Sequence, residues 1–357
     1  MSAAPIAGMP SDSCVERGWR YGRADGDMTT LTVREVKEVE WDRWDQWLAL
    51  QPWDSPFSSA WWLEANCRAF GGHPLLLGVL DGEKLVGGVA LRITDVGPMH
   101  VVRPSYIYNP IVIAAASAQS RQQVLAALLE DMARRRLVVR PLKSTTDMVD
   151  LRQAVWHHWD LTASWTVVIA LKEWTPQKDM SRRELGQLRK SQRAEVTARI
   201  EPPDADILHD LLRATVLRHG REPSLSREQL RVLVDGAGSH GMQVVARDVD
   251  GSPLSACFVM AHGPRIAYGI WAGTSPMGLT KGAAVAISVG LLGELQTRGY
   301  EYFDWCDASY PGYSDFKLKF GGTLKTCLAI AREPRWLKMA MPVYIRASQL
   351  KHALRGH

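Results

Sequence analysis

An internal repeat limits the possible folds of this chain more than any other feature of its sequence. Residues 77–91 (LGVLDGEKLVGGVAL) align without a gap to residues 246–260 (ARDVDGSPLSACFVM). In each copy an Asp-Gly pair, at 81–82 and at 250–251, separates two runs of strand-forming residues. Asp-Gly favours a type I′ turn, which needs positive φ at both central residues, so each copy predicts a β-hairpin.

The same order of elements follows both hairpins. We expect a strand, a helix and a strand at 105–113, 121–136 and 137–142, and again at 265–272, 280–298 and 300–306. This order is typical of a mixed α/β sheet with a crossover helix. The alternative is a chance repeat, since Asp-Gly hairpins are common, but the matched order of the later elements argues against it.

These patterns predict two tandem α/β units with a boundary near residues 174–180. Apolar residues at helical spacing predict three further helices in the second unit, at 181–198, 204–219 and 226–240. The expected domains are a disordered leader at 1–28, a first unit at 29–174, a second unit at 175–335 and a C-terminal tail or helix at 336–357.

Composition excludes several other classes of protein. With 357 residues, 46% of them hydrophobic and 23% charged, the chain can bury the cores of two globular units. Residues 1–28 lack the apolar segment of a signal peptide, and the longest strongly apolar stretch, 283–292, is far shorter than the ~20 residues that span a bilayer. We therefore expect a cytoplasmic protein. No metal site is predicted, because no cysteine pair or neighbouring histidine has metal-ligand spacing among Cys14, Cys67, Cys257, Cys306 and Cys327.

Three passages resemble those of a known family. They are residues 55–63 (SPFSSAWWL), residues 188–194 (LRKSQRA), and residues 299–304 (GYEYFD) together with 312–322 (GYSDFKLKFGG). The order of elements resembles the GNAT acyltransferase core. Two such cores, with helices inserted in the second and an F-K-x-x-F-G ending, resemble the Fem-type aminoacyltransferases over residues 33–330.

The resemblance implies direct acyl transfer. An amine or hydroxyl would attack an acyl group carried by CoA or by aminoacyl-tRNA, with no covalent enzyme intermediate. The chemistry then depends on position, deprotonation of the nucleophile and stabilisation of charge on the carbonyl oxygen. The sequence agrees, because it has no Gly-x-Ser-x-Gly elbow and no cluster of metal ligands.

The candidate catalytic residues lie in the second unit. The resemblance places Lys317 near the acyl donor, where a cation would hold a phosphate or the developing oxyanion; the alternative is a solvated lysine beside two core phenylalanines. Asp304 ends a strand, so its carboxylate would face a substrate crevice and accept the amine's proton, or would instead cap the strand end. Tyr313 shares a loop with Asp307 and Tyr310, which would supply acid, stacking or simple packing.

A second set of residues is expected to bind the donor. In the GNAT fold, the strand corresponding to 265–272, which residues 271–275 (WAGTS) end, exposes backbone groups to the acyl carrier, and the turn that follows binds phosphate at a helix N-terminus. The usual motif there is Arg or Gln, two residues, Gly, any residue, then Gly or Ala. Residues 279–284 (LTKGAA) keep the Gly and the final Ala, but Leu279 replaces the first residue, which argues against ordinary CoA binding unless Lys281 compensates. The candidate donor-binding residues are Trp271, Gly273, Thr274, Lys281, Gly282 and Phe316.

A basic stripe is predicted on the helix at 181–198. At helical spacing three arginines lie near one face and a lysine flanks them: Arg182, Arg189, Arg193 and Lys190. Such a stripe can follow a nucleic-acid backbone, although a solvated helix face is the alternative. We therefore expect no bound cofactor and aminoacyl-tRNA as co-substrate, with a small amine or hydroxyl acceptor. The rivals are an acyltransferase that uses acyl-CoA or an acylated carrier protein, and a non-catalytic binding protein built on the same fold.

Overall fold

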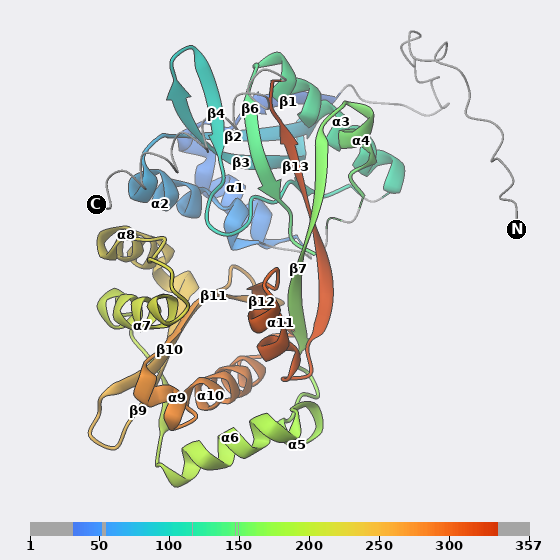
Figure 1. Cartoon of the computed structure of the whole chain (residues 1–357). Coiled ribbons are helices and arrows are strands. Elements are labelled where there is room, and N and C mark those ends of the chain that lie inside the picture. Colours follow the sequence, from blue (N-terminus) through green and yellow to red (C-terminus); the bar gives the residue numbers. More distant parts are fainter. Residues whose placement is uncertain (1–30, 52–54, 116, 147, 149, 335–357) are drawn as a thin grey trace, which may run out of the picture. The chain divides into compact units, whose positions relative to one another are not determined.

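A mixed sheet of thirteen strands runs through the described part of the chain (Figure 1). The computed structural model describes residues 31–51, 55–115, 117–146, 148 and 150–334. The predicted leader at 1–28 and the predicted tail or helix at 336–357 lie outside these residues. Along the sheet the strand order is β1-β2-β3-β4-β6-β13-β7-β12-β11-β10-β9-β8, with β5 paired to β3.

The first half of the sheet contains the first copy of the repeat, in strands β2 and β3. Its strands are β1 (Leu31–Glu35), β2 (His73–Asp81), β3 (Lys84–Val96), β4 (Met99–Arg103), β5 (Val112–Ile113) and β6 (Val138–Lys143). The helices of this half are η2 (Glu38–Glu40), α1 (Trp41–Ala49), η3 (Pro56–Ser58), α2 (Ala60–Phe70), α3 (Ala118–Arg134) and α4 (Arg152–Trp156). β4 and β6 are parallel, and α3 connects them as the predicted crossover helix.

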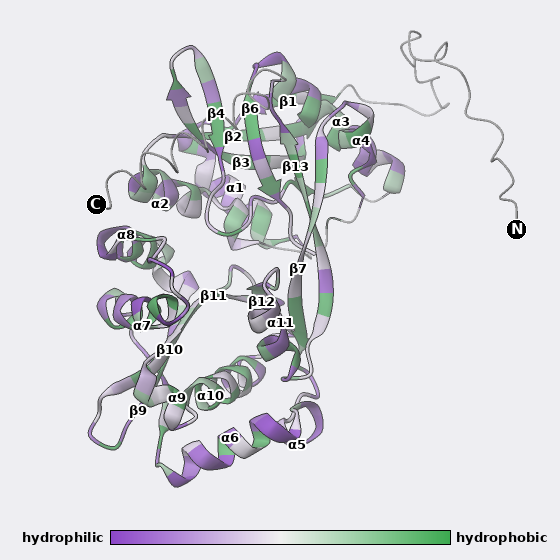
Figure 2. Cartoon of the chain, in the orientation of Figure 1, coloured by the Kyte–Doolittle hydropathy of each residue, from purple (hydrophilic) through white to green (hydrophobic). Residues whose placement is uncertain are grey.

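The second half repeats this plan. Its strands are β8 (Thr197–Glu201), β9 (Gly241–Arg247), β10 (Pro253–Met260), β11 (Ile266–Thr274) and β12 (Tyr302–Asp307), and α10 (Ala283–Thr297) connects the parallel pair β11 and β12. Its other helices are α5 (Pro176–Asp179), α6 (Arg182–Arg193), α7 (Ala205–Arg218), α8 (Arg227–Ala237), η4 (Gly238–His240), α9 (Pro276–Thr280) and α11 (Pro311–Leu318). Figure 2 shows α10 as largely hydrophobic, in keeping with its burial, and α6 as largely hydrophilic.

Two long strands are exchanged between the halves. β7 (Asp160–Ala170) follows β6 in the chain but pairs with β12, whereas β13 (Thr323–Arg332) follows β12 but pairs with β6. β7 and β13 pair with each other through nine residues, from Thr323↔Val168 to Ala331↔Asp160. The strand order is therefore the same when counted inward from either end, which confirms the predicted mixed α/β sheet in two related units.

Side chains from both halves also share a core. Phe57, Trp62 and Tyr108 of the first half pack in one cluster with Phe258 and Tyr268 of the second. Residues 31–334 consequently belong to one compact unit, and the division near residue 174 stays an interpretation of the repeat.

Three local predictions were wrong. Neither hairpin has Asp-Gly at its two central positions: Asp81 pairs with Lys84, so only Gly82 of that turn has positive φ, and the second hairpin has a five-residue loop at 248–252. Of the strand expected at 105–113, only the two-residue β5 at its end forms, and the longer strand beside β6 is β4, before this segment; prolines at 104 and 110 lack the N–H donors that a continuous ladder would need. The helix expected at 181–198 ends at Arg193, where a left-handed residue, 195, turns the chain into edge strand β8.

Candidate active site

The two parallel strands of the second half separate at their carboxyl ends. β11 and β12 pair only from Ile266↔Tyr302 to Tyr268↔Asp304. A cavity of about 1050 Å³ lies beyond that point, lined by residues 269–272 and 274 of β11 and by residues 303 and 305–307 of β12. Because ligands of open α/β sheets bind where neighbouring strands diverge at their carboxyl ends, this cavity is the candidate active site.

Asp304 holds the end of β12 rather than facing the cavity. Its side chain is fully buried and does not line the cavity. The carboxylate accepts a hydrogen bond from the backbone N of Cys306 at 2.7 Å and another from the hydroxyl of Thr166, and the hydroxyl of Tyr108 lies 3.5 Å away. Burial raises the pKa of Asp304, while these hydrogen bonds oppose the shift. The arrangement fixes the irregular backbone at Cys306, whose φ is +50°.

Lys317 supports the same strand end through hydrogen bonds to its carbonyls. Its Nζ donates hydrogen bonds to the carbonyls of Trp305 at 2.8 Å and Cys306 at 3.0 Å, and to the carbonyl of Asp307. These three bonds use all three ammonium protons. Burial lowers the pKa of Lys317. The side chain borders the cavity, but its protons are already engaged by the backbone carbonyls of residues 305–307.

The remaining acid and aromatic candidates face the cavity. Asp307 is the one carboxylate residue among the described residues that line it. Tyr313 lines it as well, edge-on to His219 with ring centroids 6.0 Å apart and to Tyr310 at 6.1 Å. A guanidinium, that of Arg221, lies 4.7 Å from the ring centroid of Tyr310. Asp307 and Tyr313 are therefore the predicted groups best placed for proton transfer in the cavity.

The predicted donor-binding residues divide into two groups. Trp271, Thr274 and Phe316 line the cavity. The other three, Gly273, Lys281 and Gly282, do not line it. Gly273 packs against the backbone of α7, where a Cβ would lie 2.3 Å from the carbonyl carbon of Leu211.

The predicted phosphate-binding turn is occupied by the protein itself. Lys281 Nζ is 2.7 Å from both carboxylate oxygens of Asp248, so it is not free to replace the missing arginine or glutamine of the motif. Gly282 begins α10 in the left-handed region with φ +75°, and a Cβ there would lie 2.6 Å from the carbonyl oxygen of Gln187. Helix α6 therefore packs closely over this turn.

Cations dominate the charged groups of the cavity wall. Against the single carboxylate of Asp307 stand five basic side chains: Arg92, Lys143, Arg218, Arg221 and Lys317. Walls with an excess of one sign of charge concentrate ligands of the other sign, so the cavity favours anionic ligands.

Sequence analysis missed the two cations contributed by the first half. Arg92 lies on β3 and Lys143 ends β6, and both reach the cavity because the strand exchange brings the two halves together. The available signal was a charged residue inside an otherwise apolar strand, since residues 85–93 contain no other charge than Arg92.

The predicted basic stripe is present on α6, away from the cavity. Four residues of the stripe are exposed and make no ion pair with a described residue: Arg182, Arg189, Lys190 and Arg193. The helix packs against α10 and contributes no side chain to the cavity lining. These charges are therefore available to a polyanion that lies along the outside of α6.

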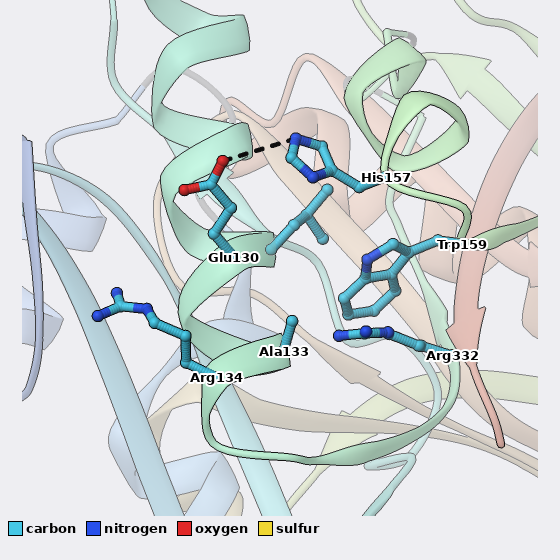
Figure 3. A pocket seen from close by; sticks show the side chains of 7 residues that line it. Glu130, Ala133, Arg134, His157, Trp159 and Arg332 are labelled. Carbon is cyan, nitrogen blue, oxygen red and sulfur yellow. Dashed lines mark ion pairs between the residues drawn. The ribbon is translucent and has the colours of Figure 1, made fainter. Parts of the chain in front are cut away.

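A second pocket, of about 260 Å³, lies between α3, α4 and β13 (Figure 3). Its polar groups already contact one another: Nε2 of His157 is 3.9 Å from a carboxylate oxygen of Glu130, and the guanidinium of Arg332 is 5.9 Å from the ring centroid of Trp159. We assign this pocket to packing at the junction of these elements.

Two kinds of feature are absent from the part of the chain that the structure describes. No group of three or more His, Cys, Asp or Glu side chains there has the geometry to hold a metal ion. No helix in these residues combines the length and apolar character of a membrane span.

Sheet topology and the position of the cavity define a fold of two tandem GNAT-like units. Solved structures with the same fold include FemX, with a TM-score of 0.64 at 12% identity, covering 83% of this chain and 96% of that one. L-PGS from Bacillus licheniformis has a TM-score of 0.55 at 14% identity, with 81% and 96% covered. The C-terminal domain of a putative lysylphosphatidylglycerol synthetase from Agrobacterium fabrum has a TM-score of 0.51 at 12% identity, with 78% and 90% covered.

These similarities confirm the Fem-type resemblance as a likeness of fold. At such identities they carry no residue roles from one protein to another. No protein-family model and no curated protein sequence matches the chain.

Proposed function

We propose that the protein is an acyltransferase that moves an aminoacyl group from aminoacyl-tRNA to an amine or hydroxyl of a small acceptor. The observation that carries the proposal is the cavity between the diverging ends of β11 and β12, whose basic lining suits an anionic donor. The similarity of fold to FemX and to a putative lysylphosphatidylglycerol synthetase supports aminoacyl transfer as the chemistry.

The side chains in the cavity suit a direct attack. The acceptor's nitrogen or oxygen bonds to the ester carbonyl carbon, the carboxylate of Asp307 accepts its proton, and the ribose oxygen of the tRNA leaves. Tyr313, which lines the same cavity, would return a proton to that leaving oxygen. Asp304 and Lys317 act as positioning residues, because both hold the backbone of residues 305–307 on which Asp307 stands.

The basic face of α6 supports tRNA as the carrier of the acyl group. The acyl-bearing end of the donor would enter the cavity, while Arg189, Lys190 and Arg193 would contact phosphates outside it. Each contact would release condensed counterions, so binding should weaken steeply as salt rises.

The test compares donors and then alters the basic face. Purified protein is incubated with labelled aminoacyl-tRNAs and with acyl-CoAs, and binding and transfer are measured. Replacing Arg189, Lys190 and Arg193 together by Gln should change the slope of log affinity for tRNA against log salt by about two, because a single strand contributes ~0.7 per contact. The matched control replaces Arg43, Lys84 and Lys172 by Gln, three exposed basic residues outside α6, and should leave the slope unchanged.

Acyl-CoA or an acylated carrier protein is the alternative donor. The closed turn at Lys281 and Gly282 argues against a CoA pyrophosphate there. Two results together would favour a thioester donor over tRNA. CoA would stabilise the protein against heat, and the α6 triple variant would keep the transfer activity and the salt dependence of wild-type protein.

A further inference from the structure

The first half of the chain contributes a buried guanidinium to the cavity. Arg92 is only 8% exposed, and it lines the cavity from β3. Its Nη1 donates to the carbonyl of Gly71 at 3.0 Å and its Nη2 to the carbonyl of Pro104 at 3.4 Å. The guanidinium carbon lies 5.3 Å from the ring centroid of Phe70. These contacts hold the group in one orientation.

The same guanidinium keeps unused donors. Its Nε is buried and makes no hydrogen bond within the described residues. A guanidinium has five N–H groups, so with two bonded to carbonyls, Nε–H and two Nη–H remain. Parallel N–H groups of this kind match the two oxygens of one carboxylate.

No described residue supplies a counter-charge for Arg92. It makes no ion pair with a described carboxylate, and the charged neighbour directly opposite it on β4 is another cation, Arg103. The nearby thiol of Cys67 is no substitute, because burial raises its pKa to about 11. A buried guanidinium without an anion is costly, and like charges facing each other across two strands add to that cost.

We propose that Arg92 binds a carboxylate of the acceptor, so that the acceptor is an amino acid or short peptide with a free carboxyl group. The inference rests on the proposed transfer function, since Asp307 in the second half would receive the acceptor's amine. Lys143 lines the same cavity, with its Nζ 5.0 Å from the ring centroid of Tyr108, and adds positive potential. The guanidinium carries one positive charge, which balances the single negative charge of a carboxylate but not the double charge of a phosphate monoester. Two of its five protons are already engaged, which leaves fewer donors for the three oxygens of a phosphate.

Matched pairs of compounds test the inference without any donor. Glycylglycine and L-alanyl-L-alanine are compared with their C-terminal amides, which differ only in the carboxylate, and inorganic phosphate is the third probe. Binding is measured by calorimetry and by thermal shift on the full chain. The free acids should bind wild-type protein at least about tenfold more tightly than the amides, the scale of one bidentate charge-assisted contact.

Variants then assign the effect to Arg92. Arg92→Gln should remove the preference for the free acids, and Arg92→Lys, which keeps the charge without the planar fork, should retain only part of it. Arg103→Gln is the control, because this cation does not line the cavity, and it should keep the preference.

Several results would overturn the proposal. They are equal affinity of wild-type protein for acids and amides, the absence of binding by either, or tighter binding of phosphate than of the dipeptides. The wild-type comparison decides even if Arg92→Gln does not fold. Affinity for tRNA is measured in parallel. If Arg92→Gln loses affinity for tRNA, Arg92 belongs to the donor site and the proposal is wrong. If wild-type protein does not bind tRNA at all, the proposed donor is refuted, but the comparison of acids with amides still tests Arg92.

Discussion

Replacing Lys317 by methionine should destabilise the protein strongly. The side chain is similar in length but cannot donate the three hydrogen bonds that now hold the carbonyls of Trp305, Cys306 and Asp307. Losing each bond costs about 1 kcal/mol, because water in the cavity can partly replace the missing donor. The free energy of unfolding should therefore fall by about 3 kcal/mol. For a chain of this size, that corresponds to a melting temperature about 4–5 °C lower.

Urea unfolding of wild-type protein, Lys317→Met and Lys325→Met measures this effect. Lys325 is exposed on β13, so its replacement is the matched control and should change the free energy of unfolding by less than about 0.5 kcal/mol. Acyl transfer should also decrease in Lys317→Met, because residues 305–307 lose their support.

The opposite combination would refute this account of Lys317. If Lys317→Met unfolds within 1 kcal/mol of wild-type protein and nevertheless loses transfer activity, the ammonium group contacts the substrate. The resemblance-based role in oxyanion stabilisation would then be correct.

Three further perturbations have separate measurements. Asp307→Asn should lower kcat by at least about tenfold at unchanged urea midpoint, because it removes the proton acceptor but not the hydrogen-bond acceptor; full activity would exclude Asp307 as the base. Gly273→Ala should cost about 2 kcal/mol or more, since a Cβ would lie 2.3 Å from backbone of α7, whereas Gly312→Ala, with nothing within 4 Å, should not; equal urea midpoints would contradict this. Burial lowers the pKa of His262 to about 4, so the unfolded chain binds the proton first as pH falls from about 6.5. Between pH 6.5 and 4, the free energy of unfolding of wild-type protein should fall by ~1–2 kcal/mol more than that of His262→Gln; this is less than the full pKa shift implies, because solvent screens this partly exposed ring. The control His158→Asn, at an exposed position, should show the same pH dependence as wild-type protein. Parallel profiles for wild-type protein and His262→Gln would refute this account.

The repeat predicted the architecture because it records local order. Hairpin, strand, crossover helix and strand each leave a periodic pattern in the sequence. Val79 lies within β2, whereas its aligned counterpart Asp248 directly follows β9 in the loop of the second hairpin, so the two hairpins correspond but their turns differ by this offset. The strand exchange left no such pattern. β7 and β13 are ordinary strands in sequence, and their partners are decided by contacts between residues more than 130 positions apart.

The candidate site was predicted in part for the same reason. Residues 304–317 follow one another in sequence, so the motif located Asp307, Tyr313 and Phe316 at the cavity. The orientation of the ionisable groups within the motif was not predictable. β12 has an irregular register between Asp304 and Asp307, and Cys306 there has a positive φ. At this irregularity the carboxylate of Asp304 accepts from the backbone N of Cys306, and the ammonium of Lys317 donates to three carbonyls.

The exchanged strands link the geometry of the cavity to the first half of the chain. The bulge on β12 is held by Thr166 on β7, and the aromatic ring of Tyr108, whose hydroxyl lies 3.5 Å from Asp304, packs against Phe57 in the shared core. A substitution that leaves a void beside Phe57 would therefore shift residues 305–307 without contacting any of them. Because packed cores transmit displacement rather than absorb it, substitutions there should alter transfer activity before they abolish folding. This coupling gives both halves of the sheet a part in the proposed transfer. The second half would present Asp307 and Tyr313 to the acceptor, while Thr166 and Tyr108 of the first half support the backbone at residues 304–306 and Arg92 lines the same cavity.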